Sequence, residues 1–270
     1  MWCKNCNIET NDPICPICGS KTVEDIPVEV YWCPECKVPV INTTTQADKG
    51  LCPLCGHKTK YLSADLRPVF PEERLLLELL LGKKPYEYMQ KSVWAANSSY
   101  YIDGKRVALP AKFFEKADTD ELSKQLEEYK GENSYEYFNV YAERFCEANR
   151  NRLNYLVDEA SEFVRNAASK FDEERLVVSF SGGKDSTVTA DLAINALGTS
   201  SIVHIFGNTT LEFPTTGEYA ERYRHNHPHA IFMVAKNEEQ NFIDVCEDIG
   251  PPARMMRWCC SMFKTGPITR

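Results

Sequence analysis

The 270-residue sequence lacks any apolar run long enough to cross a bilayer, and it lacks an excess of positive charge. No stretch approaches eighteen consecutive apolar residues, which argues against a transmembrane helix. The N-terminus reaches a cysteine pair at once instead of an apolar signal segment, so we expect a cytoplasmic protein. Its formal net charge is −8, and basic and acidic groups number 6 and 7 in residues 1–60, 16 and 19 in 61–170, and 9 and 13 in 171–270. These totals disfavour nucleic acid as a partner, although they are compatible with a local basic groove.

Cysteine is plentiful at the N-terminal end. Eight of the twelve cysteines lie in the first 55 residues and form four C-x2-C pairs. Two residues between cysteines let one tight turn direct both sulfurs at a single metal ion, and zinc prefers four such ligands. Disulfides are the alternative, which a cytosolic setting disfavours. We predict that the zinc ligands are Cys3, Cys6, Cys15, Cys18, Cys33, Cys36, Cys52 and Cys55.

The grouping of these eight thiols is a separate question. Sequence order assigns the first four to one zinc ion and the last four to a second. The later group has the spacing of a zinc ribbon, and the earlier group is short, like a rubredoxin-type knuckle pair. An interleaved arrangement is the alternative. Either way the metal replaces a hydrophobic core that segments this short cannot build, so we expect two structural Zn²⁺ sites.

The middle of the chain predicts a small α+β domain. Leucines recur with helical spacing in residues 72–81, Asp103-Gly104 is typical of a hairpin turn, and Asp118 or Thr119 is expected to cap a further helix. Residues 134–171 contain neither proline nor glycine and predict one long helix or two helices in line. We therefore expect three regions, at 1–60, 61–132 and 133–270.

A glycine-rich segment follows the strand-like run 176–180. It reads Ser181-Gly182-Gly183-Lys184-Asp185-Ser186, and a helical pattern begins at Thr187. A strand, a glycine-rich turn and a helix N-terminus bind anions, because backbone N–H groups point outward and the helix dipole favours negative charge. Lys184 adds a positive charge and the hydroxyls add donors. Asp185 would repel phosphate, so we expect it to hold Mg²⁺ or water beside a pyrophosphate.

The spacing of these glycines and the lysine differs from the G-x4-G-K-[ST] P-loop. SGGKDS instead resembles the signature of the PP-loop ATP pyrophosphatase superfamily, which includes the phosphoadenosine phosphosulfate (PAPS) reductase family. Residues 208–216 resemble that family's D-T-G-x-x-F-P-E-T segment, with Asn208, Thr210 and Thr215 in place of Asp, Gly and Glu. Residues 257–267 resemble its late C-C-x3-K-x2-P element. The resemblance covers about residues 150–270.

The resemblance implies an α/β fold: a Rossmann-like adenine-nucleotide alpha-hydrolase (PP-loop) domain that binds ATP with Mg²⁺. The α+β region and the small zinc ribbons precede it. The residues implied as catalytic are Lys184, Asp185, Cys259 and Cys260. The residues implied to contact the nucleotide are Ser179, Ser181, Gly182, Gly183, Lys184, Asp185, Ser186, Thr187, Asn208, Thr209, Thr210, Arg257 and Lys264.

The intact loop favours ATP as ligand, because sulfonucleotide reductases of this family tend to have a degraded loop. ATP-using relatives adenylylate a substrate oxygen and release pyrophosphate, after which sulfur often replaces the adenylate. We therefore expect an ATP pyrophosphatase in sulfur transfer, such as nucleic-acid thiolation or phosphorothioation, with a sulfur donor such as a cysteine desulfurase as partner. One alternative is a sulfonucleotide reductase. The other is a zinc-ribbon adaptor whose nucleotide domain only senses ATP.

Only three core strands are readable after Leu176, at 176–180, 201–206 and 230–235. A doubly wound nucleotide sheet usually has about five or six strands, so the pattern predicts a C-terminally incomplete domain or one that a partner chain completes. In cluster-bearing relatives a Cys-Cys pair and a later C-x2-C hold a [4Fe–4S] centre, which needs four thiolates. Such a cluster needs a further cysteine pair after Cys260, and this sequence has no cysteine there. Two buried structural cysteines in a minimal domain are the alternative.

Overall fold

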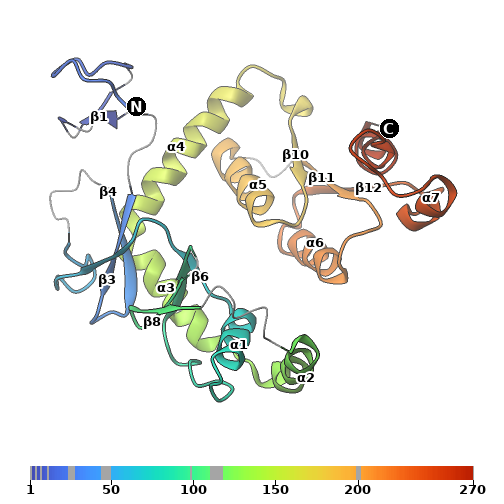
Figure 1. Cartoon of the computed structure of the whole chain (residues 1–270). Coiled ribbons are helices and arrows are strands. Elements are labelled where there is room, and N and C mark those ends of the chain that lie inside the picture. Colours follow the sequence, from blue (N-terminus) through green and yellow to red (C-terminus); the bar gives the residue numbers. More distant parts are fainter. Residues whose placement is uncertain are drawn as a thin grey trace. The chain divides into compact units, whose positions relative to one another are not determined.

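The computed structural model of the chain falls into two compact units, residues 1–153 and 154–270 (Figure 1). The structure describes residues 2–3, 5–6, 8–10, 12–23, 28–43, 50–97, 99–109, 118–198 and 202–269.

The first unit begins with two small antiparallel β-structures that carry the cysteine pairs. Strands β1 (Trp2–Cys3) and β2 (Ile8–Glu9) form a short ladder. Strand β3 (Val28–Cys33) then lies between β4 (Val38–Thr43) and β5 (Lys60–Ser63) in a three-stranded sheet. The knuckle after Cys33 connects β3 directly to β4. The β1–β2 ladder therefore ends at Cys3, and the β3–β4 ladder ends at Cys33.

A four-stranded antiparallel sheet follows, in the order β6 (Arg67–Pro68), β7 (Val93–Ala96), β8 (Ser99–Ile102) and β9 (Lys105–Ala108). Asp103 and Gly104 join β8 to β9 with φ values of 47° and 76°, the two positive angles of a type I′ hairpin, so the predicted turn is confirmed. Helix α1 (Pro71–Leu80) begins with a proline and two glutamates, and helix α2 (Thr119–Tyr129) precedes the 3₁₀ turn η2 (Lys130–Glu132). The Asp118 carboxylate caps α2 by accepting bonds from the amides of Asp120 and Glu121.

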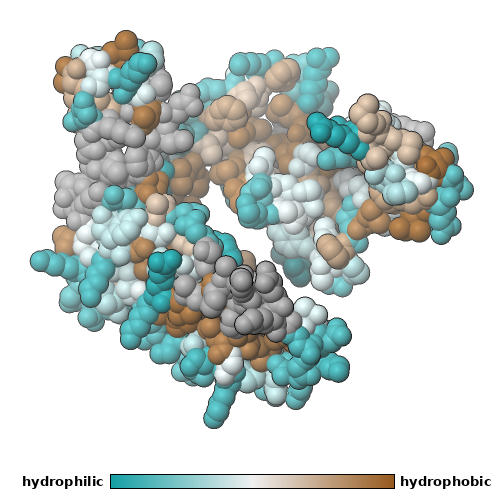
Figure 2. All heavy atoms as spheres, in the orientation of Figure 1, coloured by the Kyte–Doolittle hydropathy of each residue, from teal (hydrophilic) through white to brown (hydrophobic). Residues whose placement is uncertain are grey.

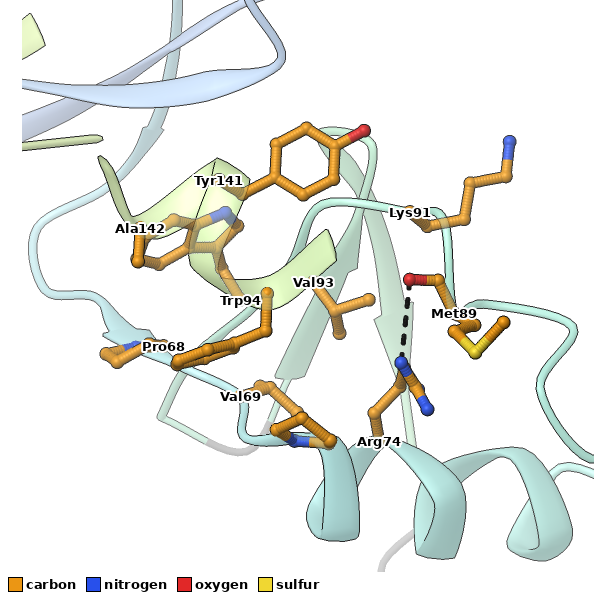
Figure 3. Close-up of a pocket in the computed structure, with 11 residues that line it drawn as sticks. Pro68, Val69, Arg74, Met89, Lys91, Val93, Trp94, Tyr141 and Ala142 are labelled. Atoms are coloured by element: carbon orange, nitrogen blue, oxygen red, sulfur yellow. Dashed lines mark hydrogen bonds between the residues drawn. The ribbon is translucent and has the colours of Figure 1, made fainter. Parts of the chain in front are cut away.

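A buried ion pair anchors α1. The Glu78 carboxylate is fully buried and accepts bonds from the backbone N–H groups of Tyr86 and Tyr88, both at 2.7 Å. Arg74 Nε lies 3.6 Å from this carboxylate, and the guanidinium also donates to Met89 O at 3.5 Å (Figure 3). Arg74 lines a cavity of about 30 Å³, which is room for about one water molecule. The pair therefore fixes the loop after α1 and is structural.

Asn149 divides the predicted helical stretch into two helices, α3 (Glu136–Ala148) and α4 (Arg150–Ala168). Its side chain is buried and bonds to the backbone: Oδ1 accepts from Ile41 N at 2.6 Å, and Nδ2 donates to Pro39 O at 3.0 Å and Phe145 O at 2.8 Å. An asparagine that bonds to neighbouring backbone competes with helical pairing. This residue consequently ends α3 and ties it to β4.

The second unit has a three-stranded parallel sheet in the order β10 (Val177–Phe180), β11 (Val203–Asn208), β12 (Ile231–Lys236). The predicted second strand begins two residues later than expected, and Ser201 lies outside the described residues. The remaining elements are η3 (Glu173–Arg175), α5 (Lys184–Leu197), α6 (Pro214–Asn226), α7 (Phe242–Ile249), the π-helical η4 (Cys260–Thr265) and α8 (Gly266–Thr269). The expected α/β architecture is confirmed.

Helices α5 and α6 cover one face of this sheet. Phe180 and Phe206 of the strands pack there against Ala190 of α5 and Tyr223 of α6. Side chains on the other face, such as Val177 and Met233, are more than half exposed. Figure 2 also shows hydrophobic side chains on the surface where Figure 1 labels α7, the helix of the exposed Ile243 and Ile249. Among the described helices, none has the length and apolarity needed to cross a membrane.

His204 on β11 is a fully buried polar residue in this core. Its Nδ1 lies 2.9 Å from the carbonyl oxygen of Ile202, so the neutral ring donates there. Nε2 has no hydrogen-bond partner among the described residues, and the same is true of the nearby Tyr223 hydroxyl. Burial lowers the pKa of His204, because a charged imidazolium would lose its hydration.

We expect the second unit to lose stability in mild acid. Below about pH 6.5, the ordinary histidine pKa, the unfolded chain takes up a proton that the folded chain excludes from His204, so the free energy of unfolding falls. Thermal melting of wild type, His204→Gln and the exposed control His229→Gln at pH 7.5 and 5.5 measures this. The His204→Gln protein should lose less of its melting temperature between the two pH values than the other two proteins. An equal drop in all three would contradict the assignment.

Candidate functional site: a glycine-rich loop and two cysteine clusters

The glycine-rich loop connects the end of β10 to the start of α5. Gly182 has φ of 75°, which disfavours other residues, and a Cβ there would lie 3.1 Å from Thr216 Cγ2 of α6. The loop therefore needs glycine both for its backbone and for its contact with α6. Gly183 is the N-cap of α5 and has no side chain that could cap the helix. The residues that follow it in the first turn, Lys184 and Asp185, are exposed to solvent. This turn is a place for an anion.

Hydroxyl groups hold the loop in shape. Ser186 Oγ donates to Gly183 O at 2.9 Å and accepts from Ser181 N at 3.2 Å. Thr187 Oγ1 donates to the same carbonyl at 3.0 Å and accepts from the Tyr219 hydroxyl of α6 at 3.1 Å. In this unliganded state Ser186 and Thr187 therefore preorganise the loop.

Lys184 and Asp185 project from the loop into solvent. Their side chains are 88% and 89% exposed, and Lys184 Nζ lies 2.6 Å from Asp185 Oδ1. An ion pair this exposed contributes little to stability. This pair can therefore separate, so that Lys184 contacts a phosphate oxygen and Asp185 contacts a divalent cation.

The segment after β11 is held by its own side chains. Glu212 Oε1 accepts from the Thr209 amide at 3.0 Å and from the Thr209 hydroxyl at 2.7 Å, and Asn208 Oδ1 accepts from Thr210 N at 2.9 Å. Thr210 has φ of 69°, an uncommon angle for a β-branched residue. Its hydroxyl accepts from Phe242 N at 2.8 Å, which links the segment to the start of α7. Thr210 thus keeps the left-handed backbone expected of glycine and gains a bond to α7.

The third predicted element, residues 257–267, forms η4 and the start of α8. The η4 helix packs against β11, Asn237 Nδ2 after β12 donates to Met262 O at 3.3 Å, and Ile268 lies against Gly207. Arg257 lies 3.7 Å from the thiol of Cys260, while Lys264 is exposed. The element is therefore seated at the carboxyl ends of β11 and β12.

Most of the predicted nucleotide residues share one edge of the sheet. Phe180 pairs with Phe206 in the parallel ladder, so the loop after β10 and the segment 208–210 leave the sheet at its carboxyl end, where open α/β sheets bind ligands. Ser179 is different: it alternates with Phe180 and faces the exposed side of the sheet. Sequence reasoning overlooked Glu212, Thr216 and Tyr219, although the Thr209-x-x-Glu212 spacing is that of a capping box.

We expect Glu212 to be a positioning residue for this edge. In Glu212→Gln a neutral amide oxygen accepts the two bonds from Thr209 more weakly than the charged carboxylate does, so the segment loosens. The KM for ATP should rise by roughly threefold to tenfold with a smaller change in kcat, a loss of about 1 kcal/mol of ground-state binding. Steady-state pyrophosphate release measures this, with the exposed Glu218→Gln as the control. Unchanged KM in Glu212→Gln would show that the bonds only shape the unliganded segment.

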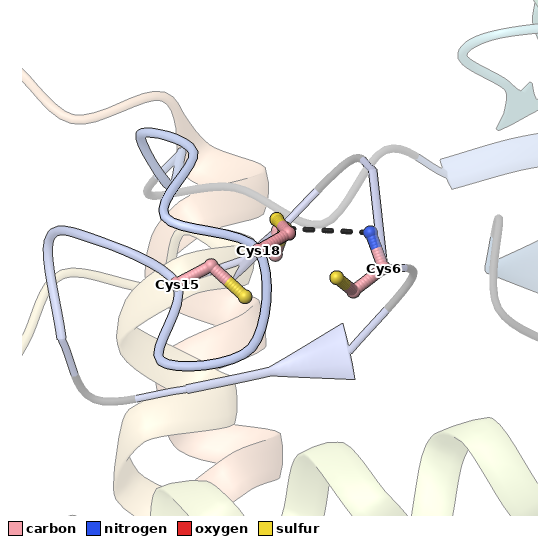
Figure 4. Close-up of side chains that lie close together, drawn as sticks. Cys6, Cys15 and Cys18 are labelled. Atoms are coloured by element: carbon pink, nitrogen blue, oxygen red, sulfur yellow. Dashed lines mark hydrogen bonds between the residues drawn. The ribbon is translucent and has the colours of Figure 1, made fainter.

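The first cysteine cluster gathers Cys3, Cys6, Cys15 and Cys18, whose sulfur atoms all lie within 4.8 Å of one another. Figure 4 shows the labelled members Cys6, Cys15 and Cys18 around a common centre. Hydrogen bonding from Ser20 lowers the pKa of the Cys18 thiol to about 6. The cluster therefore includes a thiol that readily ionises to the form that binds metal.

The second cluster gathers Cys33, Cys36, Cys52 and Cys55, again within 4.8 Å. The backbone N–H of His57 lowers the pKa of Cys55 to about 6. Cys33 and Cys52 also belong to the hydrophobic core of this region, where Val38, Val40 and Ala148 of α3 pack against them. The clusters follow sequence order, so the interleaved alternative is wrong. Four thiolates at this spacing fit a tetrahedral Zn²⁺.

Cys259 and Cys260 do not form such a set. Within the described residues they belong to no group of three or more metal-ligating side chains. A [4Fe–4S] cluster needs four thiolates, so Cys259 and Cys260 by themselves do not fit one.

Most of the second unit is similar to a known domain family. Residues 175–270 match the family model of the phosphoadenosine phosphosulfate reductase domain. The uncharacterized protein MJ0066 of Methanocaldococcus jannaschii is 31% identical over 147 residues, 54% of this chain and 30% of that protein. The uncharacterized protein MJ0973 of the same organism is 25% identical over 128 residues, 47% of this chain and 30% of that protein. The chain thus matches less than a third of the length of either relative.

A solved PAPS reductase from Candida auris, in a phosphate complex, is 20% identical, with coverage of 44% of this chain and 59% of that chain and a TM-score of 0.31. The family model covers the glycine-rich loop, the segment after β11 and the late cysteine element together. The part of the chain that carries the SGGKDS loop therefore matches the phosphoadenosine phosphosulfate reductase domain family, and the region before it carries two cysteine clusters suited to zinc.

Proposed function

We propose that the second unit binds ATP with Mg²⁺ at residues 181–187 and cleaves it to AMP and pyrophosphate, which activates a substrate oxygen for replacement by sulfur. Nucleic-acid thiolation of the phosphorothioate type is the proposed reaction class, with a cysteine desulfurase as a suitable sulfur donor. The observation that carries this proposal is the complete loop, with Gly182 in its left-handed conformation and the Lys184 and Asp185 side chains exposed to solvent.

The residues divide the work by their chemistry. Backbone N–H groups at the start of α5 and the Lys184 ammonium would bind the phosphates and neutralise charge as pyrophosphate leaves. Asp185 would hold Mg²⁺, which supplies further charge neutralisation on the phosphate oxygens when bound. A substrate oxygen attacks the α-phosphorus, the bond to the β-phosphate oxygen breaks, and a sulfur nucleophile then displaces AMP. Positioning and charge account for most of such catalysis.

The position of residues 257–267 supports a role for these residues near the reacting end of the nucleotide. Cys259 and Cys260 lie at the start of η4, which packs on β11, and Arg257 accompanies the Cys260 thiol. We propose that Cys260 or Cys259 handles sulfur and that Arg257 and Lys264 contact the nucleotide. The zinc clusters are proposed as structural.

A sulfonucleotide reductase is the second candidate. The family description and the half-exposed cysteine pair favour it, because a reductase needs a thiol near the sulfonucleotide. In that case adenosine phosphosulfate or its 3′-phosphorylated form binds at the loop and ATP is not turned over.

Product analysis distinguishes the candidates. The purified chain is incubated with ATP, Mg²⁺, an oligonucleotide that supplies the acceptor oxygen and a sulfide source, and AMP and pyrophosphate are quantified. Equal amounts of both products are expected. Nucleotide binding without any product would leave a sensing role, and sulfite formed from a sulfonucleotide in the presence of a thiol reductant would establish the reductase.

A further inference from the structure

A second, larger cavity lies in the first unit, away from every residue assigned above except Cys52. Its volume is about 550 Å³. Its walls come from three places: Asn42 of β4, the knuckle around Leu51 and Pro53, and the α3–α4 junction with Glu147, Arg150 and Arg152. A cavity of this size accommodates a small ligand or one unit of a polymer.

The cavity is built on a fixed frame. Asn149, one of its lining residues, bonds to Ile41 N and Pro39 O, so the start of α4 is tied to β4. Ala148 and Cys52 belong to the same hydrophobic core. Hydrogen bonds from Cys52 N to His57 O and from Gly56 N to Cys52 O shape the knuckle. These contacts therefore hold the walls of the cavity at a fixed spacing without a ligand.

Donors predominate in the lining. Arg150 and Arg152 bring two guanidinium groups, and Glu147 is the lone acidic side chain in the lining. Arg150 is 68% exposed, and its Nη2 lies 3.9 Å from Glu147 Oε1. This distance is too long for a strong bidentate pair. The buried Asn42 amide nitrogen has no acceptor within the described part of the chain. The cavity is thus an exception to the acidic character of the whole sequence.

Positive charge continues outside the cavity. Leu51, which lines it, pairs with Lys58 in an isolated β-bridge, and Lys60 begins β5 two residues later. Both lysines are exposed, and neither takes part in an ion pair that the structure records in the described residues. Four thiolates around one Zn²⁺ carry a net charge of about −2 and Glu147 adds one negative charge, whereas Arg150, Arg152, Lys58 and Lys60 supply four positive charges.

We propose that this cavity binds a phosphodiester unit of single-stranded nucleic acid. Guanidinium groups match the bidentate geometry of phosphate oxygens, and the half-exposed Leu51 and the exposed Pro53 offer apolar surface to a base. A double helix cannot enter a cavity of about 550 Å³, whereas one nucleotide of a single strand fits. The site is independent of ATP chemistry at the glycine-rich loop.

The test is fluorescence anisotropy with labelled single-stranded RNA and DNA of one sequence, about twenty nucleotides long. The R150A/R152A protein is compared with wild type and with R165A/R175A, which removes the same charge from exposed positions of the second unit. The first variant should bind at least about tenfold more weakly, and the slope of log affinity against log salt should fall by about 1.4. The control should bind within about twofold of wild type. Zinc content and melting temperature establish that all three proteins are folded.

Three results would overturn the proposal: unchanged affinity in R150A/R152A, an equal loss in R165A/R175A, or a free mononucleotide that binds as tightly as the oligonucleotide. The last result would identify a small phosphate ligand instead. Lys184→Ala, assayed in parallel, should bind the oligonucleotide like wild type. Failure of the proposed ATP reaction is therefore distinguishable from failure of this site.

Discussion

Replacing Lys184 with alanine should reduce pyrophosphate release from ATP by on the order of 100-fold, the usual effect of removing one preorganised donor from a charge-stabilising site. The side chain is 88% exposed at the start of α5, and its only described partner is Asp185, so the substitution leaves the core intact. Asp185→Asn should instead raise the Mg²⁺ concentration needed for half-maximal activity, because an amide binds Mg²⁺ more weakly than a carboxylate does.

Lys170→Ala is the matched control, because Lys170 is also exposed but lies before β10 rather than in the loop. It should keep wild-type activity. Circular dichroism and melting of all three variants should match wild type. If Lys184→Ala turns over ATP at the wild-type rate, the loop is not the site of the reaction.

The second large effect concerns zinc, and the two clusters should differ. Cys33→Ser should reduce bound zinc from two ions to one and unfold the β3–β4–β5 sheet, because this cluster shares its core with α3. Structural zinc contributes on the order of 10 kcal/mol in zinc-finger peptides, as much as the stability of a whole domain. Cys15→Ser should also lose one zinc ion, but the described contacts of its cluster are local, so the rest of the first unit should stay folded.

Elemental analysis and melting of both variants measure these outcomes. Cys146→Ser is the control, since Cys146 is exposed and belongs to neither cluster. It should keep two zinc ions and the wild-type melting temperature. Full zinc content in Cys33→Ser would contradict the assignment of that thiol as a ligand.

Local spacing was the most informative part of the sequence. The four C-x2-C pairs predicted both clusters, and the Asp103-Gly104 pair predicted its hairpin, because each signal depends on a few adjacent residues. The order strand, SGGKDS, helix likewise predicted the loop between β10 and α5. These features need no knowledge of distant contacts.

Other features depended on tertiary contacts that spacing does not contain. Asn149 divides the long helical stretch because its side chain bonds to β4, more than 100 residues away in sequence. The αL backbone of Thr210 follows from the family pattern, but its bond to Phe242 does not. The basic cavity was invisible in the charge totals, because Arg150 and Arg152 meet the knuckle of residues 51–56 only in the folded unit.

The most direct test of ATP binding at the glycine-rich loop is a pair of calorimetric titrations of the full chain, one with MgATP and one with adenosine phosphosulfate. Saturation by one MgATP per chain, lost in Lys184→Ala and retained in Lys170→Ala, is the expected result. Tight binding of the sulfonucleotide with no heat from MgATP, or MgATP binding that is unaffected by Lys184→Ala, would contradict ATP recognition at this loop.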